Sequence, residues 1–293
     1  PTKMAARAYM AKVYLYQSKW KECLEACDEV IQSGKYELFP DFRNVFLPEN
    51  DNCSEIIFAI QLSINDGSPN NENGSYGDRL LPPGGPYPVY GFLRPTQNLV
   101  NAYKTDVKGL PYNDGKDVSE NDYVDVRLDH TLARPNIPFM DVQLYDWTPR
   151  EASVYGPYSP KKRLVSLNST YYSPIWPYVN ALNFYVIRYA DLLLWRAEAA
   201  IETGDLETGR KYINMIRERA KNTQHVKTMD QSQDAANYKV GVYDEPFKSK
   251  NEAVQALRME RRLEMAHEGI RFFEDLEKLD CHGIGLTTLN VGK

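Results

Sequence analysis

Cysteine is scarce in this sequence of 293 residues, which contains only four. Cys23, Cys27, Cys53 and Cys281 are too few for a disulfide scaffold, and their spacing matches no zinc-binding pattern. Cys23 and Cys27 lie one turn apart on an expected helix, where the geometry suits a disulfide poorly. We therefore predict that the cysteines are small buried residues. They do not indicate whether the protein works in an oxidising or a reducing compartment.

Long apolar and basic runs are also missing. No stretch of about 20 apolar residues could span a bilayer, and the first residues do not resemble a signal peptide. The chain begins PTKMAARAYM, with proline where an initiator methionine would stand and a helical pattern already under way, so we expect residues upstream. A net charge of −5 and a pI near 5.6 argue against a surface that binds nucleic acid or anionic membranes.

Sequence signatures of catalysis and cofactor binding are absent as well. The four histidines are scattered, and His267-Glu268 lacks the second histidine of a metalloprotease helix. Among 40 acidic residues no spacing singles out a catalytic pair, and no glycine-rich loop resembles a nucleotide-binding motif. The amide-rich stretch 65–78 departs from the EF-hand pattern, which favours a plain loop over a calcium site. We expect no catalytic residue, no cofactor and no metal site.

The strongest positive pattern runs from residue 183 to residue 220 and predicts two helices joined by a tight turn. Apolar side chains recur at helical spacing, first at Ile187, Ala190, Leu194, Ala197 and Ile201 and then at Gly209, Ile213, Ile216 and Ala220. Between them, Gly204 can adopt the left-handed conformation that ends a helix, and Asp205 can cap the next one. Other apolar residues cover the rest of the first helix, which we therefore expect to pack on several sides.

A second hairpin of the same kind is predicted from residue 2 to residue 34. When Gln17-Ser18 is aligned with Thr203-Gly204, apolar residues coincide in both helices, and Ser18 falls where a helix cap is expected. The matched pairs are Ala8 with Leu194, Ala11 with Ala197, Leu15 with Ile201, Cys27 with Ile213 and Val30 with Ile216. Two such copies are typical of tetratricopeptide-like repeats, which stack because no single unit can bury its own apolar faces.

Between the repeats the composition changes. The run EIIFAIQLS, residues 55–63, predicts a short strand, and residues 61–180 are then crowded with Gly, Pro, Asn, Asp and Tyr. A helical pattern at 95–103 predicts one short helix within this region. A loop-rich insertion of this length is usually functional. We therefore divide the chain into a repeat hairpin with its following segment at 1–60, a ligand-binding insertion at 61–180, and a second repeat with C-terminal helices at 181–293.

After a polar loop, a last long helix is expected to begin at Ser249. The sequence SKNE forms a capping box in which Glu252 reaches back, and Gly269 is expected to end or kink the helix. Like charges stand one turn apart on this helix, for example Glu260 and Glu264, and such pairs are unfavourable in isolation. We therefore predict an ion network between this helix and the hairpin, for which the candidate partners are Arg188, Asp191, Arg196 and Glu198.

Aromatic residues are abundant, with 21 tyrosines and 4 tryptophans. Sugars present an apolar C–H face that lies well on an aromatic ring, and their hydroxyls need Asn, Asp, Arg or Gln nearby. Several aromatic residues of the insertion have such polar residues close to them in the sequence. Stacking on nucleic-acid bases is disfavoured, because basic residues that would bind the phosphates are lacking. The predicted ligand-binding residues are Tyr145, Trp147, Tyr171, Tyr172 and Trp176, with Tyr155 and Tyr158 in the same group. For each one, packing in the core is the alternative role.

Several motifs resemble those of the SusD/RagB family, the surface glycan-binding lipoproteins of Bacteroidetes. The similar segments are PTKMAARAYMAKVYLY at 1–16, RPTQNLVNAY at 94–103, DVRL at 125–128, YGPYSPKK at 155–162, IRYADLLLWRAEAAIETG at 187–204, INMIRERA at 213–220 and ALRMERRLEMAHEGIRFFEDL at 256–276. Their order and spacing cover nearly the whole chain to about Leu276. The sequence departs from the family pattern in DLEKL, where the family has DLRRW, and in the end CHGIGLTTLNVGK.

The resemblance implies a mainly α-helical protein, a tetratricopeptide-like repeat scaffold with a long loop-rich insertion and little β structure. It also implies a non-catalytic cell-surface subunit that captures oligosaccharide and delivers it to a SusC-like TonB-dependent transporter of the outer membrane. The membrane would be reached only through a lipid anchor in an N-terminal part outside this sequence. Peptide binding by the same kind of protein, a repeat-based interaction adaptor and an all-helical glycosidase are the alternatives that the residues leave open.

Overall fold

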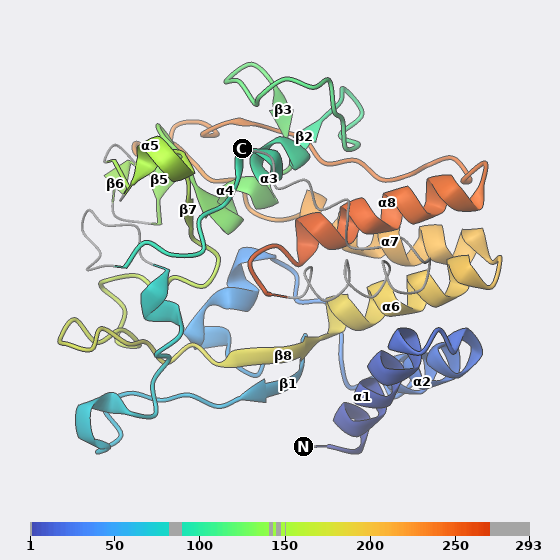
Figure 1. The fold of residues 1–293 in the computed structure, drawn as a ribbon, viewed down its shortest axis with the longest axis horizontal. Helices are drawn as coiled ribbons and strands as arrows, with labels where there is room; N and C mark the ends of the chain where they lie inside the picture. The colour runs from blue at the N-terminus through green and yellow to red at the C-terminus, as the bar shows by residue number, and fades with distance from the viewer. Residues whose placement is uncertain (1, 82–89, 141–142, 145–147, 150, 270–293) are drawn as a thin grey trace.

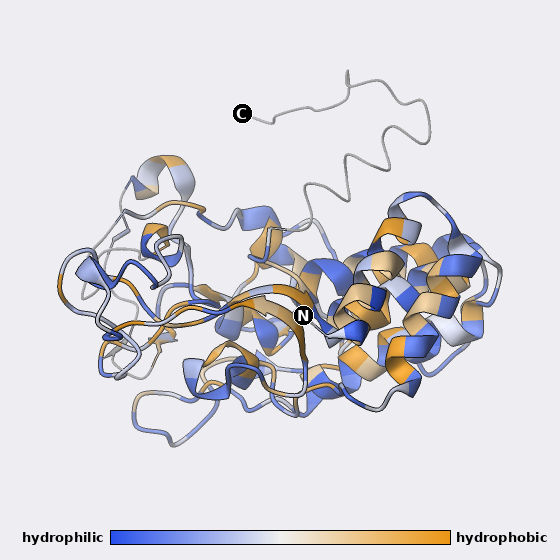
Figure 2. Cartoon of the chain, turned by 90° about the horizontal axis from the view of Figure 1, so that it is seen from below, coloured by the Kyte–Doolittle hydropathy of each residue, from blue (hydrophilic) through white to orange (hydrophobic). Residues whose placement is uncertain are grey.

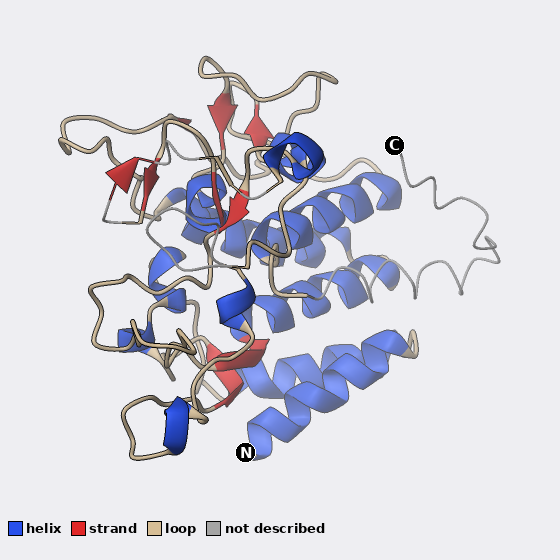
Figure 3. Cartoon of the chain, turned by 60° about the vertical axis from the view of Figure 1, so that its left-hand side comes forward, coloured by secondary structure: helices blue, strands red, loops and turns tan. Residues whose placement is uncertain are grey.

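The computed structural model describes residues 2–81, 90–140, 143–144, 148–149 and 151–269. Helices gather on one side of the molecule, and loops with short strands occupy the other side (Figure 1, Figure 3). The protein is mainly helical and contains little β structure, as predicted. Within these ranges, no helix combines the length and the apolar character needed to cross a membrane.

The two predicted hairpins are present and in register with each other. α1 spans Lys3–Tyr16, α2 spans Trp20–Gln32, α6 spans Tyr189–Glu202 and α7 spans Leu206–Lys221. α1 and α6 start 186 residues apart (189 − 3), and so do α2 and α7 (206 − 20). All ten residues of the five matched apolar pairs are buried. The repeat alignment made from the sequence is therefore confirmed.

The turns inside the two hairpins match in backbone conformation but not in capping. Ser18 and Gly204 occupy the same position and both have positive φ, 53° and 94°. Asp205 caps α7 by accepting a hydrogen bond from the main-chain N–H of Thr208 at 3.0 Å. The prediction that Ser18 is a cap is wrong, because its left-handed backbone ends α1 and Lys19 stands at the start of α2 without a capping side chain.

α6 is the central helix of the layer. It lies between α2 on one side and α7 with α8, which spans Lys250–Glu264, on the other (Figure 1). Its side chains are buried around most of the circumference, as predicted, and Trp195 is only 1% exposed. Gly209 lets α7 approach α6 closely, since a Cβ there would lie 2.4 Å from the side chain of Ile201. Figure 2 shows apolar and polar stretches alternating along the helices of this layer.

The predicted cysteine environment is confirmed for the first hairpin. Cys23 and Cys27 are free and fully buried against α6. Cys53 is also free and partly buried. Cys281 lies outside the described residues. Burial and a hydrogen bond between the two thiols of α2 raise the pKa of Cys27, with the hydrogen bond the larger cause.

A two-stranded sheet continues the scaffold toward the loops. β1 spans Ile56–Ile60, as predicted, and pairs antiparallel with β8, which spans Phe184–Arg188. The prediction that residues 183–188 begin the helix is wrong. This stretch is rich in aromatic and β-branched residues, and it gains backbone partners from β1, while the N–H of Tyr189 donates to the carbonyl of Glu55 at 2.8 Å where α6 starts.

The remaining elements are short and are joined by turns, and most of them lie in the insertion. They are η1 (Arg43–Phe46), η2 (Pro48–Asn50), η3 (Pro69–Asn71), η4 (Asp78–Leu80), α3 (Gln97–Ala102), β2 (Lys104–Thr105), β3 (Tyr123–Val124), α4 (Arg127–Thr131), β4 (Leu132–Ala133), β5 (Pro138–Phe139), β6 (Gln143–Leu144), α5 (Ala152–Tyr155), β7 (Ser159–Pro160) and β9 (Asn237–Tyr238). The strands form the small sheets β2-β3-β9, β4-β7 and β5-β6. The helix predicted at 95–103 is α3, which Thr96 caps.

α8 begins where the sequence predicts and ends before the predicted residue, Gly269. The Ser249 hydroxyl accepts from the N–H of Glu252 at 3.2 Å, and the Glu252 carboxylate reaches back to the N–H of Lys248. The helix ends at Glu264, not at Gly269. The Lys162 ammonium binds the carbonyls of Glu264 and Ala266 at 2.7 and 3.1 Å, so a side chain from the insertion satisfies the last turn.

The predicted ion network joins α8 to the scaffold. The carboxylate of Glu264 is fully buried and accepts hydrogen bonds from three arginines: Arg127 of α4, Arg188 of β8 and Arg219 of α7. Glu260, one turn earlier, pairs with Arg127 at 2.7 Å and with Arg217 at 2.8 Å. Like charges along α8 are therefore offset by cations from three other segments.

The predicted partners were partly right. Arg188 binds Glu264, and Asp191 pairs with Arg261 at 3.0 Å, as expected. Arg196 is a wrong assignment, because it turns to α2 and pairs with Asp28 at 2.6 Å. The cations Arg217 and Arg219 of the second hairpin helix, Arg127 of α4 and the carboxylate of Glu55 were not predicted as partners.

Replacing Glu264 with glutamine is expected to lower the free energy of unfolding by about 3 kcal/mol or more, because three buried guanidinium groups lose their shared carboxylate. Equilibrium urea unfolding measures this. The control is Glu218→Gln on α7, whose exposed pair with Lys221 is worth less than about 1 kcal/mol. Equal effects of the two substitutions would contradict the network.

The lowered pKa of Glu264 predicts that the protein loses stability in acid. Burial alone would raise the pKa of Glu264, but Arg219, Arg188 and Arg127 outweigh it and lower the pKa to about 2 from 4.5. Since the folded pKa lies below the unfolded one, the contribution of Glu264 is present above pH 4.5 and is lost as the pH falls toward 2. Urea unfolding across this range should show a smaller acid dependence in Glu264→Gln than in the unsubstituted protein.

Candidate functional site

Aromatic rings gather around one arginine on the loop side of the molecule. The guanidinium carbon of Arg79 faces three ring centres, Tyr76 at 5.0 Å, Trp176 at 5.5 Å and Tyr90 at 5.9 Å. Trp176 also meets Tyr178 edge to face, with ring centres 5.8 Å apart. We call these five residues the aromatic cluster. Trp176 is 62% exposed, so much of its indole is accessible to a ligand.

A buried ion pair fixes the turn that carries Tyr76 and Arg79. Asp78, in η4 between them, binds Arg163 through two contacts of 2.9 and 3.0 Å. Both side chains are almost fully buried. The hydroxyl of Ser75 donates to the same carboxylate at 2.8 Å. This bidentate geometry is the strong form of the arginine–carboxylate interaction, and it anchors the turn to the interior.

A hairpin-like loop at 171–181 carries Trp176. Tyr172 and Asn180 form an antiparallel bridge, and the N–H of Ser173 donates to the carbonyl of Val179 at 2.9 Å. The tip of the loop is exposed. The N–H of Ser75 donates to the carbonyl of Asn180 at 2.7 Å, which joins this loop to the turn around Asp78. Two segments about a hundred residues apart thus bring Arg79 and Trp176 together.

The arrangement suits a ligand with an apolar face and polar groups around it. The exposed indole offers a flat apolar surface. A guanidinium group carries five N–H donors and no acceptor, and the side chain of Arg79 is partly exposed. An exposed ring surface and a partly exposed donor group therefore lie side by side. The five residues of the aromatic cluster include no carboxylate, whereas hydrolysis of a sugar requires a paired acid and base.

The predicted ligand-binding residues have different surroundings. Tyr145 and Trp147 lie outside the described residues. Trp176 belongs to the aromatic cluster, and Tyr171, 38% exposed, lies at the base of the same loop. Tyr172 is buried in a small core with Val165 and Leu182, and burial raises the pKa of its phenol to about 12.

Two further aromatic residues of the predicted group lie elsewhere. Tyr155 is exposed at the end of α5. The Tyr158 hydroxyl donates to the side chain of Gln97 at 2.7 Å, and its ring packs on the core around α3 and α4. Neither residue belongs to the aromatic cluster, in which three rings converge on Arg79.

Sequence reasoning missed four members of the aromatic cluster: Tyr76, Arg79, Tyr90 and Tyr178. Tyr76 and Arg79 are three residues apart, a spacing that places two side chains on one side of a helical turn. That signal was present in the sequence. Their proximity to Trp176 was not, because it depends on the tertiary contact between Ser75 and Asn180.

The amide-rich stretch around Asp66 forms a turn closed by its own side chains. The carboxylate of Asp66 accepts hydrogen bonds from Ser63, Asn73 and the N–H of Ser68, which lower its pKa, with Ser63 the largest cause. Among the described residues, no group of three or more His, Cys, Asp or Glu side chains is placed to hold a metal ion.

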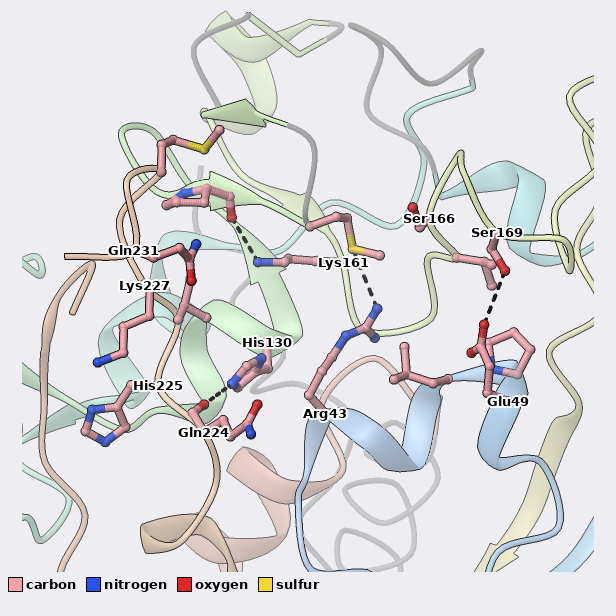
Figure 4. A pocket seen from close by; sticks show the side chains of 17 residues that line it. Arg43, Glu49, His130, Lys161, Ser166, Ser169, Gln224, His225, Lys227 and Gln231 are labelled. Atoms are coloured by element: carbon pink, nitrogen blue, oxygen red, sulfur yellow. Dashed lines mark hydrogen bonds between the residues drawn. The ribbon is translucent and has the colours of Figure 1, made fainter. Parts of the chain in front are cut away.

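A cavity of about 680 Å³ lies apart from the aromatic cluster (Figure 4). Its walls come from five segments: η1 with η2, the end of α4, β5 with the residue after it, the turn at 161–169 and the loop at 224–231. The hydroxyl of Ser169, on its rim, accepts from the N–H of Tyr171, so the rim leads into the loop that carries Trp176. This volume is typical of small-molecule sites.

The fold stacks two tetratricopeptide-like hairpins and carries exposed aromatic rings on loops that are anchored to this scaffold. The family model that matches the chain is that of the SusD family, over residues 54–276. This match covers about three quarters of the sequence, and the chain therefore belongs to the SusD family. The resemblance read from the sequence motifs is confirmed.

Similar proteins share this fold. A SusD-like protein P25 from Formosa agariphila is 25% identical over 267 residues, which are 83% of this chain and 46% of that protein. The structure of a SusD-like carbohydrate binding protein from Bacteroides fragilis matches with a TM-score of 0.67 and 22% identity, over 96% of this chain and 53% of that one. A laminarin binding SusD-like protein matches with a TM-score of 0.58 and 20% identity, over 95% and 55%. The chain thus spans about half the length of these relatives.

The geometry of the aromatic cluster predicts which substitutions the fold tolerates. Trp176→Ala should change the free energy of unfolding by less than about 0.5 kcal/mol, because the indole is mostly exposed. Asp78→Asn should cost about 3 kcal/mol, because it leaves the buried guanidinium of Arg163 without a charged partner. Thermal unfolding followed by circular dichroism compares the two. A large loss in Trp176→Ala would mean that the ring packs in the core.

Proposed function

We propose that this protein is a non-catalytic glycan-binding subunit that captures oligosaccharide on the aromatic cluster. The observation that carries the proposal is the exposed indole of Trp176 beside the guanidinium of Arg79, on a loop anchored to a rigid scaffold. A pyranose ring would lie on the indole, and Arg79 would donate to its hydroxyl oxygens. Because the anchored loops hold both groups before the ligand arrives, little conformational entropy is lost on binding.

Membership of the SusD family supports this assignment. Fold relatives are described as carbohydrate binding and as laminarin binding. By the same family resemblance, we place the protein at the outer-membrane surface, where a lipid anchor would hold it. There it would deliver oligosaccharide to a SusC-like TonB-dependent transporter. The protein would act by capture and release, and the transporter would move the glycan inward.

Trp176→Ala is expected to weaken glycan binding roughly ten-fold or more, since burying an aromatic side chain against a ligand is worth about 1.5–3 kcal/mol. Arg79→Ala should weaken binding through the lost hydrogen-bond donors. Isothermal titration calorimetry with a panel of soluble glycans that begins with laminarin measures both. Tyr112→Ala is the matched control, because Tyr112 is 49% exposed on a different loop.

The outcome separates the functional classes. Binding that is unchanged in both Trp176→Ala and Arg79→Ala, with Tyr112→Ala also unchanged, would remove the aromatic cluster as the site. The same glycans are incubated with the protein and assayed for new reducing ends. Retention of glycan without new reducing ends supports a binding protein, whereas released products would identify a glycosidase.

A further inference from the structure

The inner wall of the cavity beside η1 carries two cationic side chains from different segments. Lys161, which follows β7, and Arg43 of η1 are drawn in the middle of the view in Figure 4. Lys161 is only 4% exposed, and its ammonium donates to the main-chain carbonyls of Asp129 at 2.6 Å and Pro138 at 3.1 Å. Arg43 donates to the main-chain carbonyls of Lys162 at 2.8 Å and Leu164 at 3.1 Å. The two acceptors of the Lys161 ammonium are thus neutral oxygen atoms.

Lys161 differs from the other buried cations in the described part of the chain. Each of the others has a carboxylate within 4.0 Å: Lys104, Arg127, Lys162, Arg163, Arg188, Arg217, Arg219 and Arg261. Lys161 has no ion pair within these ranges. A buried charge without an opposite charge costs several kcal/mol, and this protein avoids that cost elsewhere. An ammonium also has three donors, and two of them are used here.

The carboxylate of Asp129, which acts on Lys161 electrostatically, binds two other side chains. Asp129 binds Arg134 through contacts of 2.7 and 2.8 Å and accepts from the hydroxyl of Tyr238 at 2.7 Å. The pKa of Lys161 is lowered to about 8, and burial is the largest cause. The positive charge of Arg43 lowers this pKa further, whereas the negative charge of Asp129 raises it. At neutral pH the ammonium is therefore mostly charged, and a second negative group beside it would stabilise it.

Other groups that face the cavity leave its inner wall cationic. The His130 ring binds the carbonyl of Gln224 at 2.7 Å, and burial with the nearby Lys161 lowers its pKa to about 4, so the ring is neutral at pH 7. Lys227 pairs with Asp234 near the rim. Glu49 lies on the far side, where the hydroxyl of Ser169 reaches it at 3.4 Å (Figure 4).

We propose that this cavity binds an oxyanion, a carboxylate or a sulfate group carried on a sugar, with Lys161 as its cationic partner and Arg43 beside it. The serine hydroxyls and the Gln224 amide on the walls would bind the sugar hydroxyls. The cavity volume of about 680 Å³ accommodates one or two such sugar units. This site is separate from the aromatic cluster, and its occupation does not depend on whether Trp176 binds a glycan.

Titration calorimetry of the whole chain tests the proposal with four probes: glucuronate, glucose 6-sulfate, glucose and inorganic sulfate. Glucuronate or glucose 6-sulfate should bind at least about ten-fold tighter than glucose, because only the anions meet the ammonium. Affinity should fall as the pH rises through about 8, where Lys161 loses its proton. If neither anionic sugar binds, or if glucose binds equally well, the proposal is wrong.

Two charge reversals localise the site without disturbing the interior. Lys227→Glu changes an exposed side chain that lines the cavity, and it should weaken the anionic sugar roughly five-fold. Lys211→Glu makes the same change on an exposed face of α7 and should have no effect. Equal weakening by both would indicate only general charge attraction and would overturn the site.

Lys161→Gln removes the proposed partner itself. It should abolish binding of the anionic sugar while laminarin binding at Trp176 persists, which also shows that the variant is folded. If Lys161→Gln does not fold, the pH dependence and the Lys227→Glu result decide. Inorganic sulfate that binds as tightly as glucose 6-sulfate would support the oxyanion site and identify the free anion as its ligand. Failure of the anionic probes with laminarin still bound at Trp176 would overturn this proposal alone.

Discussion

The buried carboxylate of Glu264 is the interaction on which the rest of the structure depends. It sits at the end of α8 and receives arginines from the insertion, from β8 and from α7, so one carboxylate joins four segments of the chain. Arg127 is the link to the loop side, since it also binds Asp125 and Glu260. In a buried network of this kind the loss of one charge leaves several others uncompensated. The loop-rich half is thereby fixed to the helical half by charges as well as by apolar packing.

This anchoring explains how loops of low regularity can present a defined surface. Lys162 binds the carbonyls at the end of α8, and the next residue, Arg163, holds the turn at Asp78 through a bidentate pair. Two adjacent side chains thus connect the scaffold to the turn that carries Arg79. Binding residues on loops positioned by a rigid scaffold are a common arrangement in recognition proteins. Here the scaffold is the repeat stack, and the aromatic cluster is the surface it positions.

Under the two proposals, the aromatic cluster and the cavity beside η1 would bind different parts of a glycan. Trp176 would provide an apolar face for a neutral sugar ring, and Lys161 would provide a buried positive charge for an acidic group. The short segment 166–172 lies between them, because Ser169 borders the cavity and also fixes the backbone of Tyr171. If both sites act on one glycan, the first would contribute stacking and the second would select for charge. Selectivity then arises from a buried polar group that only the correct ligand satisfies.

The sequence by itself determined the repeats, because helical periodicity and turn residues are local properties. It predicted both hairpins, the buried stripe of α6, the start of α8 and the membership of the family. It misassigned residues 184–188, since only pairing with β1 makes that stretch a strand. Tertiary structure alone decided which arginines meet Glu264 and which rings surround Arg79. The contacts of Arg188 with Glu264 and of Arg79 with Trp176 join residues more than 70 positions apart, and no local pattern specifies which distant segment will supply a compensating charge or a neighbouring ring.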